Sequence, residues 1–552
     1  MRHFLRKPEV LILLVSAWIA LTCNLAYWRV VASNIPTGEL LTPLYFFSVA
    51  LVTVGLIYTV MLILAIGPVA RLVLGLALVV AAAAGYFTDK FGILFDTGML
   101  VNVIETNTAE ALELLSPSLI ATVTAFGVVP ALIVWRFPMV ARRLPIAILE
   151  RGVAVIIALG FIAGPLYLNQ KEIFSLGRNH REIRHMIAPL NVISATYSHV
   201  RDSIETPAVY RQLALDASHV EAIGEDIRPS VHVLIVGETA RAASFSLNGH
   251  LHNTNPELAQ QSNVQFIEAT SCGTATAMSL PCMFAIEQRG EFQSEFGRTE
   301  DNLLDIAARA GYAVHWVDNG NGCKGVCARV DSRDVHLSDV DHICPDGECY
   351  DEILVHELKS LLSSVTDDTL IVLHQLGSHG PAYFRRYPDD YRAFLPDCRS
   401  ANLGDCSIEA ISNSYDNTIL YTDHVISSAI DALAAESDRI NASLIYMSDH
   451  GESLGEHNLY LHGMPYQFAP DEQTHIPMIT WFGAEVGQDS GLQSSCTSRD
   501  VLSPVSHDNL FHTELGMLGI ETSVYNPAMD IFAPCRNQAL LITAGNVPAN
   551  RS

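Results

Sequence analysis

The stretch VHVLIVGETAR, residues 231–241, sets the expectation for the fold of the larger part of this chain. Five of its first six residues are apolar and most of these are β-branched, which predicts a strand. Similar short runs follow at Leu370–Leu373 and Leu444–Met447, and helical stretches separate them. This alternation predicts an α/β domain over residues 231–552.

Metal-binding residue types follow each of these three runs. Glu238 follows the first, His379 the second, and Asp449 and His450 the third. Ligands of open α/β sheets bind beyond the carboxyl ends of the strands, so we expect these residues to converge. Carboxylate and imidazole together suit zinc or manganese. His462 is a further candidate, as a second metal ligand or a phosphate contact. An isolated Asp-His pair or a surface histidine has a plainer explanation, but three such strand ends in one domain favour a metal site. The predicted group comprises Glu238, His379, Asp449 and His450.

The segment SCGTATAMSLPC, residues 271–282, has the composition of a nucleophile loop. Small residues and hydroxyls lead into a predicted helix, whose N-terminus would offer N–H groups and a positive dipole end to an anion. A nearby metal can activate such a hydroxyl for attack on phosphorus. The alternative is a helix N-cap without chemistry. By composition, Thr274, Thr276 and Ser279 remain equal candidates.

The first third of the chain is strongly apolar. Five runs, near 10–31, 44–67, 69–87, 117–137 and 151–168, are each long enough to cross a bilayer, so residues 1–168 are expected to form a transmembrane domain. Basic residues gather before the first run and at the turns after the second and fourth runs, which predicts a cytoplasmic N-terminus and puts everything after residue 168 outside. Residues 169–230 are predicted to be a bridging helical linker on the membrane surface or a plain solvated segment.

Charge and cysteine usage agree with an exported catalytic part. The net charge is −26, and the first 170 residues hold 10 Lys/Arg against 8 Asp/Glu, so the acidic excess lies beyond them and argues against nucleic acid as a partner. Ten of the 11 cysteines lie beyond residue 270, mostly in sequence-close couples typical of disulfides from an oxidising compartment. The alternative for Cys323, Cys327, Cys344 and Cys349 is a four-thiolate zinc site.

At these motifs the chain resembles a known family. GETAR (237–241), the 271–282 loop, HQLGSHGPAY (374–383), SDHGESLGE (448–456) and LHGMP (461–465) are similar to the lipid A phosphoethanolamine transferases, which include the mobile colistin resistance enzymes and belong to the alkaline phosphatase superfamily. The resemblance covers nearly the whole chain. It implies five transmembrane helices followed by a soluble α/β domain with an alkaline-phosphatase-like sheet flanked by helices.

The resemblance also implies roles for individual residues. Thr276 matches the nucleophile that carries phosphoethanolamine during turnover. Glu238, Thr276, Asp449 and His450 match the ligands of a catalytic zinc ion. The remaining matches are contacts to the phosphoethanolamine group or to a second zinc ion (His379, His462), to the headgroup (Lys324) and to the lipid (Asn102, Glu110).

The family pattern further implies disulfides. It pairs Cys272 with Cys282, Cys344 with Cys349 and Cys398 with Cys406, and it pairs Cys323 with Cys327 in some members. By elimination, Cys496 is expected to pair with Cys535.

The implied activity is transfer of phosphoethanolamine from phosphatidylethanolamine to a phosphate of lipid A in the inner membrane of a Gram-negative bacterium, with the catalytic domain in the periplasm. Loss of negative surface charge would then give resistance to polymyxins. The alternatives are the same chemistry on a core sugar or a periplasmic glucan, a phosphatase or sulfatase, and a membrane sensor without activity. A sulfatase would normally show a Cys or Ser followed by Pro and Arg in a C/S-x-P-x-R pattern, and the 271–282 loop has no such arginine.

Overall fold

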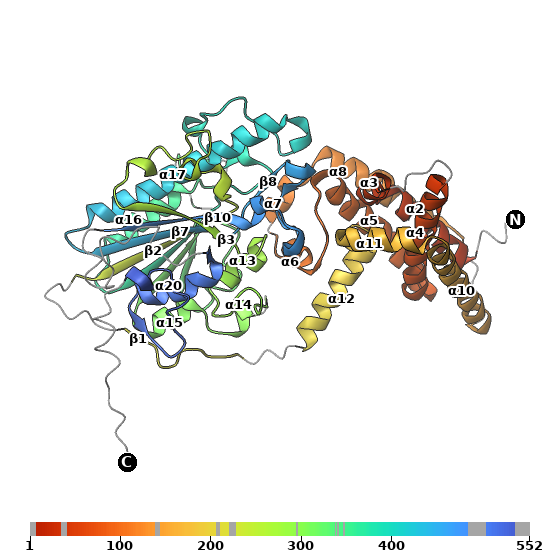
Figure 1. Ribbon diagram of the computed structural model, residues 1–552, viewed down its shortest axis with the longest axis horizontal. Coiled ribbons are helices and arrows are strands. Elements are labelled where there is room, and N and C mark those ends of the chain that lie inside the picture. The colour runs from red at the N-terminus through yellow and green to blue at the C-terminus, as the bar shows by residue number, and fades with distance from the viewer. Residues whose placement is uncertain are drawn as a thin grey trace, which may run out of the picture. The chain divides into compact units, whose positions relative to one another are not determined.

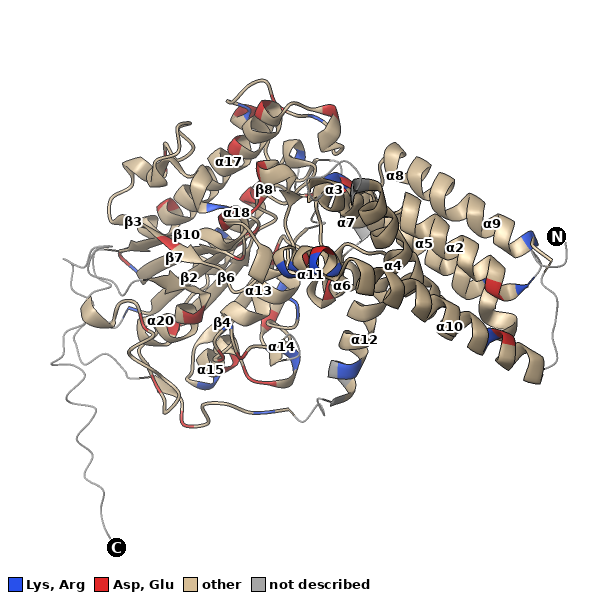
Figure 2. Ribbon diagram, turned by 45° about the vertical axis from the view of Figure 1, so that its right-hand side comes forward, with Lys and Arg blue, Asp and Glu red and all other residues tan. Residues whose placement is uncertain are grey.

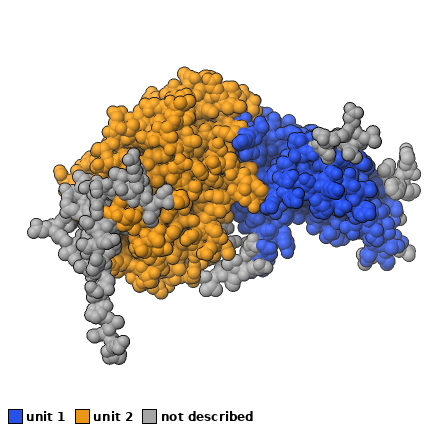
Figure 3. Space-filling model, in the orientation of Figure 1, with its two compact units in different colours: residues 1–104, 111–205, 457–460 blue, residues 105–110, 206–456, 461–552 orange. Residues whose placement is uncertain are grey.

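A computed structural model gives the structure of residues 7–34, 41–106, 108–138, 144–205, 210–219, 228–293, 296–336, 338, 340, 342–345, 348–483 and 504–535. The chain forms two compact units (Figure 3). Unit 1 comprises residues 1–104, 111–205 and 457–460, and unit 2 comprises residues 105–110, 206–456 and 461–552. Each unit is described separately.

Unit 1 is helical. Four of its described helices or helix runs are long and apolar enough to cross a membrane, namely Pro43–Leu64, Gly67–Phe91, Pro117–Arg136 and Pro145–Leu168. They correspond to the last four predicted runs. The span Pro145–Leu168 begins several residues before the run predicted for it. Charged side chains are rare along these helices, and α4 (Leu41–Leu64) carries none (Figure 2). In the span Pro117–Arg136, a π-helical turn, Val123–Val128, joins α8 (Pro117–Thr122) to α9 (Val129–Arg136).

The first predicted run is broken. It contains α2 (Pro8–Thr22) and α3 (Leu25–Ser33), which are bent by 64° and make a fifth span only if the pair is counted as one. Asn24 lies at the break, and its buried side chain donates to the carbonyl of Ile19 (2.9 Å) and accepts from the N–H of Ala188 (2.7 Å). These bonds tie the break to the segment around Ala188 within unit 1. Gly85 permits the close approach of the Cys23 carbonyl, because a Cβ there would lie 2.0 Å from that oxygen.

The segment predicted as a linker is mostly helical where it is described. It contains α11 (Gln170–Asn179) and α12 (Leu190–Glu205), both of which belong to unit 1. The alternation of polar and apolar residues along α11 fits a helix with one apolar face.

Unit 2 is built on an eight-stranded mixed sheet covered by helices on both faces (Figure 1). The three predicted strands lie side by side and parallel at its centre, with β2 (Ser230–Gly237) between β6 (Thr369–His374) and β7 (Asn441–Ser448). β10 (His475–Phe482) is antiparallel to both of its neighbours, β3 (Val264–Thr270) and β7. In spatial order the strands are β11 (Val505–Ser506), β3 (Val264–Thr270), β10 (His475–Phe482), β7 (Asn441–Ser448), β2 (Ser230–Gly237), β6 (Thr369–His374), β4 (Ala313–Asp318) and β5 (Asp331–Asp334).

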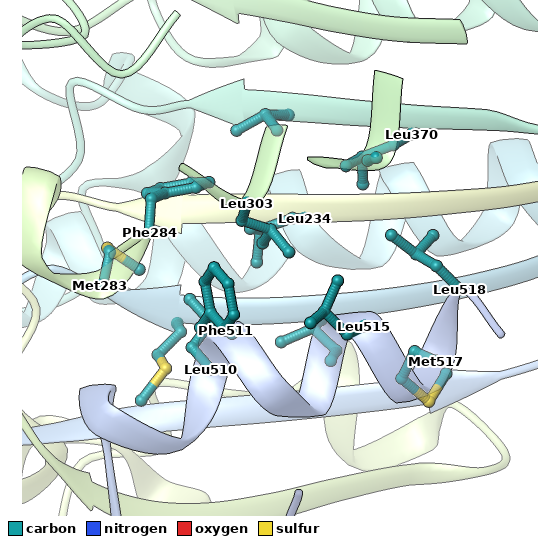
Figure 4. Close-up of a cluster of buried hydrophobic side chains, with 14 of the residues drawn as sticks. Leu234, Met283, Phe284, Leu303, Leu370, Leu510, Phe511, Leu515, Met517 and Leu518 are labelled. Atoms are coloured by element: carbon teal, nitrogen blue, oxygen red, sulfur yellow. The ribbon is translucent and has the colours of Figure 1, made fainter. Parts of the chain in front are cut away.

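Helices α16 (Glu352–Leu362) and α17 (Ile408–Ala435) cover one face of the sheet, and α13 (Thr276–Met283), α15 (Leu303–Arg309) and α20 (Leu510–Met517) cover the other (Figure 1). Alternate strand residues such as Leu234 and Leu370 point into the second layer, where they pack with Phe511 and Leu515 of α20 (Figure 4). This arrangement of a mixed sheet between two layers of helices confirms the predicted fold class of the soluble part. The dry core holds the central strand ends in fixed register.

Candidate metal and phosphoryl-transfer site

The ends of β2 and β7 bring two carboxylates and an imidazole together. Gly237 pairs with Ser448 in the sheet, so Glu238 and Asp449 emerge from adjacent strands, and His450 follows. Ligand atoms of these three residues all lie within 4.8 Å of one another, and all three side chains are buried. The Nε2 atom of His450 is 3.4 Å from both a Glu238 and an Asp449 oxygen. Three of the four residues expected to converge, Glu238, Asp449 and His450, therefore lie together, and His379 is not in this group.

Backbone and side-chain hydrogen bonds fix the orientation of this cluster. Asp449 Oδ1 accepts from the N–H of Thr239 (3.1 Å) and from that of His450 (2.7 Å). His450 Nδ1 lies 2.9 Å from the carbonyl of Gly451, which leaves Nε2 facing the carboxylates. Burial opposes the charged imidazole, but Asp449 and Glu238 outweigh it and raise the pKa of His450 above its usual value.

The 271–282 loop places one hydroxyl at the cluster. Thr276 is the first residue of α13, and its Oγ1 lies 3.1 and 3.2 Å from the Glu238 oxygens and 3.4 Å from His450 Nε2. The hydroxyl of Thr274 donates instead to the carbonyl of Met464 (2.6 Å). That of Ser279 donates to its own helix at Ala275 (3.0 Å) and is 3.4 Å from Asp449. Of the three candidates, Thr276 makes the closest approach to the clustered ligand groups.

Two further histidines stand beside the cluster. The ring centroid of His462 lies 4.4 Å from that of His450 and 5.4 Å from that of His379. Glu452 accepts from His462 Nδ1 (2.8 Å) and from the hydroxyl of Tyr383. Burial raises the pKa of Glu452 to about 8, although the Tyr383 hydrogen bond lowers it. Both histidines therefore lie where they could donate a proton to a group bound at the cluster.

Comparison with known proteins identifies relatives of both parts of this chain. Residues 230–520 match the family described as Sulfatase, and residues 53–204 match the one described as Phosphoethanolamine transferase EptA/EptB. Phosphoethanolamine transferase EptA of Salmonella typhimurium is 37% identical, over 97% of this chain and 99% of the relative. This chain belongs to the EptA phosphoethanolamine transferase family.

Other members support the same assignment. Phosphatidylethanolamine transferase Mcr-1 of Escherichia coli is 33% identical, over 90% of this chain and 94% of its own. The structure of the integral membrane lipooligosaccharide phosphoethanolamine transferase A of Neisseria meningitidis is similar to this one, with a TM-score of 0.91 and 35% identity over 96% of this chain and 98% of that one. The chain is therefore an enzyme of the transferase class and a multi-pass membrane protein, as the sequence predicted.

The chemistry of the cluster in this transferase fits a divalent cation. Glu238 and Asp449 are two buried carboxylates, and among the described residues neither forms an ion pair with a lysine or arginine. Buried like charges at this separation need a compensating positive charge. Two carboxylates, an imidazole and a hydroxyl are oxygen and nitrogen donors of the type that zinc takes.

The remaining predicted contacts of the transferase are Lys324, Asn102 and Glu110. Lys324 has a left-handed backbone conformation (φ 50°) and its ammonium donates to the carbonyl of Asn321 (2.9 Å). Asn102 lies half-buried on α6 (Thr97–Glu105) in unit 1. Glu110 lies on α7 (Thr108–Glu113), and its side chain is outside the described residues.

Four disulfides of the transferase agree with the family pattern, namely Cys272–Cys282, Cys323–Cys327, Cys344–Cys349 and Cys398–Cys406. The alternative of a four-thiolate zinc site is therefore wrong. The first bond closes the loop that carries Thr276. Cys496, the expected partner of Cys535, lies outside the described residues.

Sequence reasoning missed His507, Glu452 and Tyr383. His507 is buried, accepts from the N–H of Cys272 (3.0 Å) through Nδ1, and donates to the carbonyl of Ser448 (2.9 Å) through Nε2. It thereby links the 271–282 loop to the last residue of β7, directly before Asp449. Burial lowers the pKa of His507 to about 4, so its ring is neutral. His507 lies in the turn before α20, and no motif or spacing in the sequence marks it.

Proposed function

We propose that this transferase moves phosphoethanolamine from phosphatidylethanolamine to a phosphate of lipid A, with Thr276 as the covalent carrier. The observation that carries the proposal is the position of the Thr276 hydroxyl, 3.1 Å from Glu238 at a buried carboxylate and imidazole cluster. A hydroxyl at a helix N-terminus beside such a cluster is suited to attack a phosphoryl group. The resemblance to the lipid A transferases supports the choice of donor and acceptor.

Zinc would be held by Glu238, Asp449, His450 and the Thr276 hydroxyl. When bound, it would lower the pKa of that hydroxyl and offset negative charge on the phosphoryl oxygens. His379 and His462, beside the cluster, are the residues that would hold a second ion. Glu238 has two oxygens within 3.2 Å of Oγ1 and is thus placed to accept the hydroxyl proton.

The reaction we propose has two displacements. In the first, a bond forms between Thr276 Oγ1 and phosphorus, the bond from phosphorus to the diacylglycerol oxygen breaks, and that oxygen takes a proton. His462, oriented by Glu452 at 2.8 Å, or His379 is placed to give this proton. In the second, an oxygen of the lipid A phosphate attacks the same phosphorus, the bond to Thr276 breaks, and Thr276 recovers its proton. The backbone N–H groups at the start of α13 face the negative charge in both steps.

The membrane setting follows from the substrates. Both are lipids, and unit 1 contains at least four helices able to span a bilayer among its described residues. The proposed location is the inner membrane of a Gram-negative bacterium, with a cytoplasmic N-terminus and a periplasmic unit 2, because basic residues cluster at the turns of one side and disulfides form in unit 2. The added ammonium group reduces the net negative charge of lipid A, so cationic peptides such as polymyxins would bind more weakly.

Mass spectrometry of lipid A from expressing cells tests the proposal. We expect one added phosphoethanolamine with the wild type and a loss of more than about 1000-fold with Thr276→Ala, because removal of a nucleophile eliminates the covalent route. Thr274→Ala is the matched control. It removes a threonine hydroxyl of the same loop that is bonded to Met464, which costs about 1 kcal/mol, so its activity should stay within about tenfold of wild type.

Three other outcomes would each overturn a different part of the proposal. Unmodified lipid A together with consumption of phosphatidylethanolamine would move the acceptor to a core sugar or glucan, or to water in a hydrolase. Full activity of Thr276→Ala would exclude the covalent threonine. Unchanged polymyxin susceptibility despite modified lipid A would separate the chemistry from resistance.

A further inference from the structure

A second group of metal-ligand side chains lies in unit 2, outside the Thr276 cluster. It consists of His250 and His252 in the loop after Ser246–Asn248 and of Asp416 on α17. The Nε2 atom of His250 is 2.9 Å from Asp416 Oδ2, and the Nδ1 atom of His252 is 2.7 Å from the same oxygen. Ligand atoms of all three residues lie within 4.8 Å of one another.

The carboxylate is held out of water, whereas the histidines face it. Asp416 is 2% exposed, and its second oxygen, Oδ1, is buried without a hydrogen-bond partner among the described residues. The side chains of His250 and His252 are 23% and 43% exposed. An incoming cation could therefore reach the group from solvent and meet a carboxylate with unused acceptor capacity.

Packing fixes the direction of both rings. The rings of His250 and His252 are nearly perpendicular, with an interplanar angle of 85° and a centroid distance of 5.6 Å. His252 also stacks on Phe394 at 4.6 Å and 5°. A ligand group that is already oriented loses little side-chain entropy when a metal binds.

We propose that His250, His252 and Asp416 bind a zinc ion, separate from any ion at the Thr276 cluster. Two imidazoles and one carboxylate are a ligand set that zinc takes with three protein donors, and the exposed side leaves room for a water as the fourth. Without metal, both ring N–H groups donate to Asp416 Oδ2. On binding, the cation takes the place of these protons at the two nitrogens, and each neutral ring carries its proton on its other nitrogen.

The two N···O distances need only a small adjustment to suit a zinc ion. Two ligand atoms at about 2.0–2.1 Å from a tetrahedral zinc ion lie about 3.3 Å apart, so the N···O distances would widen by roughly half an ångström. The proposal does not depend on the transfer activity, because none of the three residues belongs to the transfer site.

A zinc ion bound to these three residues would stabilise the segments that hold the transfer site in place. Asp416 follows Tyr415, whose hydroxyl donates to the carbonyl of Thr239 (2.7 Å) and accepts from the N–H of Arg241 (3.0 Å). Zinc would therefore join the 250–252 loop to the same part of α17 that holds the segment after Glu238. Arg241 carries a positive charge nearby. Its guanidinium is paired with Glu456 at 2.6 Å, which reduces its electrostatic repulsion of a bound cation.

The test is zinc binding by the full chain in detergent. Chelator-treated protein is dialysed against about 10 µM zinc chloride, and bound zinc is counted by elemental analysis. The key variant is His252→Gln, because an amide N–H can still donate to Asp416 but glutamine is a poor zinc ligand. We expect His252→Gln to bind one zinc fewer per chain than the wild type. His315→Gln is the matched control, because His315 pairs with the single carboxylate of Asp331 (2.9 Å), and it should bind the wild-type amount.

Thermal unfolding gives a second readout. Zinc should raise the midpoint of the wild type by roughly 2–5 °C more than that of His252→Gln, since only the wild type gains the energy of the second ion. His250→Gln should behave as His252→Gln does, and retained lipid modification would show that both variants are folded. Equal zinc content in His252→Gln, His250→Gln and the wild type would overturn the proposal.

Discussion

His507 shows how much one buried side chain can contribute to the transfer site. Its two ring nitrogens bond to backbone groups of two segments that are distant in sequence, next to Cys272 and at Ser448. One nitrogen accepts and the other donates, so both bonds require the neutral ring. Protonation would replace the accepted bond with a repulsion between two N–H groups and place an uncompensated charge in the core.

The stability of the protein should therefore depend on pH through His507. Its folded pKa of about 4 lies below its ordinary value of 6.5, so the unfolded chain binds the proton more readily. The stabilising contribution is complete above pH 6.5 and is lost as the pH falls towards 4, by up to about 3 kcal/mol. We expect the thermal midpoint of chelator-treated wild type to drop between pH 7 and pH 5.

His507→Gln separates this effect from the titration of other groups. The variant should be less stable than the wild type at pH 7, because glutamine cannot restore both bonds, but its midpoint should fall less between pH 7 and pH 5. Equal slopes for the two proteins would show that His507 is not the group responsible.

At the scale of elements, the site depends on strand register and on the helices that fix it. Glu238 and Asp449 are neighbours because β2 and β7 are paired from Ser230–Asn441 to Gly237–Ser448. The layer of α13, α15 and α20 packs against this part of the sheet, and α20 contributes Leu510, Phe511 and Leu515 (Figure 4). Any loosening of this layer would be transmitted to the strand ends, because protein interiors are close-packed.

Leu515→Ala tests this packing. Leu515 is 0% exposed, and its truncation should reduce the free energy of unfolding by about 2–5 kcal/mol through lost burial and the cavity left behind. Ile408→Ala, at a position that is 62% exposed, should change it by less than about 0.5 kcal/mol. Denaturant titration of both variants gives the comparison, and similar losses in the two would contradict a packed core under the sheet.

For the whole molecule, charge and hydropathy divide the chain between two environments. The helices of unit 1 have apolar surfaces, with many leucines, isoleucines and valines exposed to their surroundings, whereas the acidic residues lie mostly in the rest of the chain. Exposed apolar side chains on this scale are stable only in contact with lipid. Unit 1 is therefore a membrane domain, and the export of unit 2 stays a prediction.

Reporter fusions test the orientation that the basic residues predict. An enzyme that is active only outside the cytoplasm should be inactive when fused after residue 138, which follows the fourth predicted run, and active when fused after residue 205. The physical reason is that positively charged turns remain in the cytoplasm. Expression of both fusions is checked by immunoblotting, and the reverse pattern of activity would refute the proposed topology.

Much of this architecture could be predicted from local sequence. The runs VHVLIV, LIVL and LIYM indicated three strands, and the polar residues after them indicated where Glu238, Asp449 and His450 converge. The apolar runs indicated the membrane helices. Such features are readable because strand and helix periodicity, and the position of ligands at parallel strand ends, depend on a few consecutive residues.

Other features were decided only by the tertiary structure. The approach of Thr276 rather than Thr274 to Glu238, the bridge made by His507, the pairing of Glu452 with His462 and the meeting of His250 and His252 with Asp416 all join segments that no local pattern relates. The hydrogen bond between Asn24, at the bend, and Ala188 likewise joins residues 164 positions apart. Hydropathy and spacing fix which elements form, but the contact between two particular side chains depends on how the elements pack.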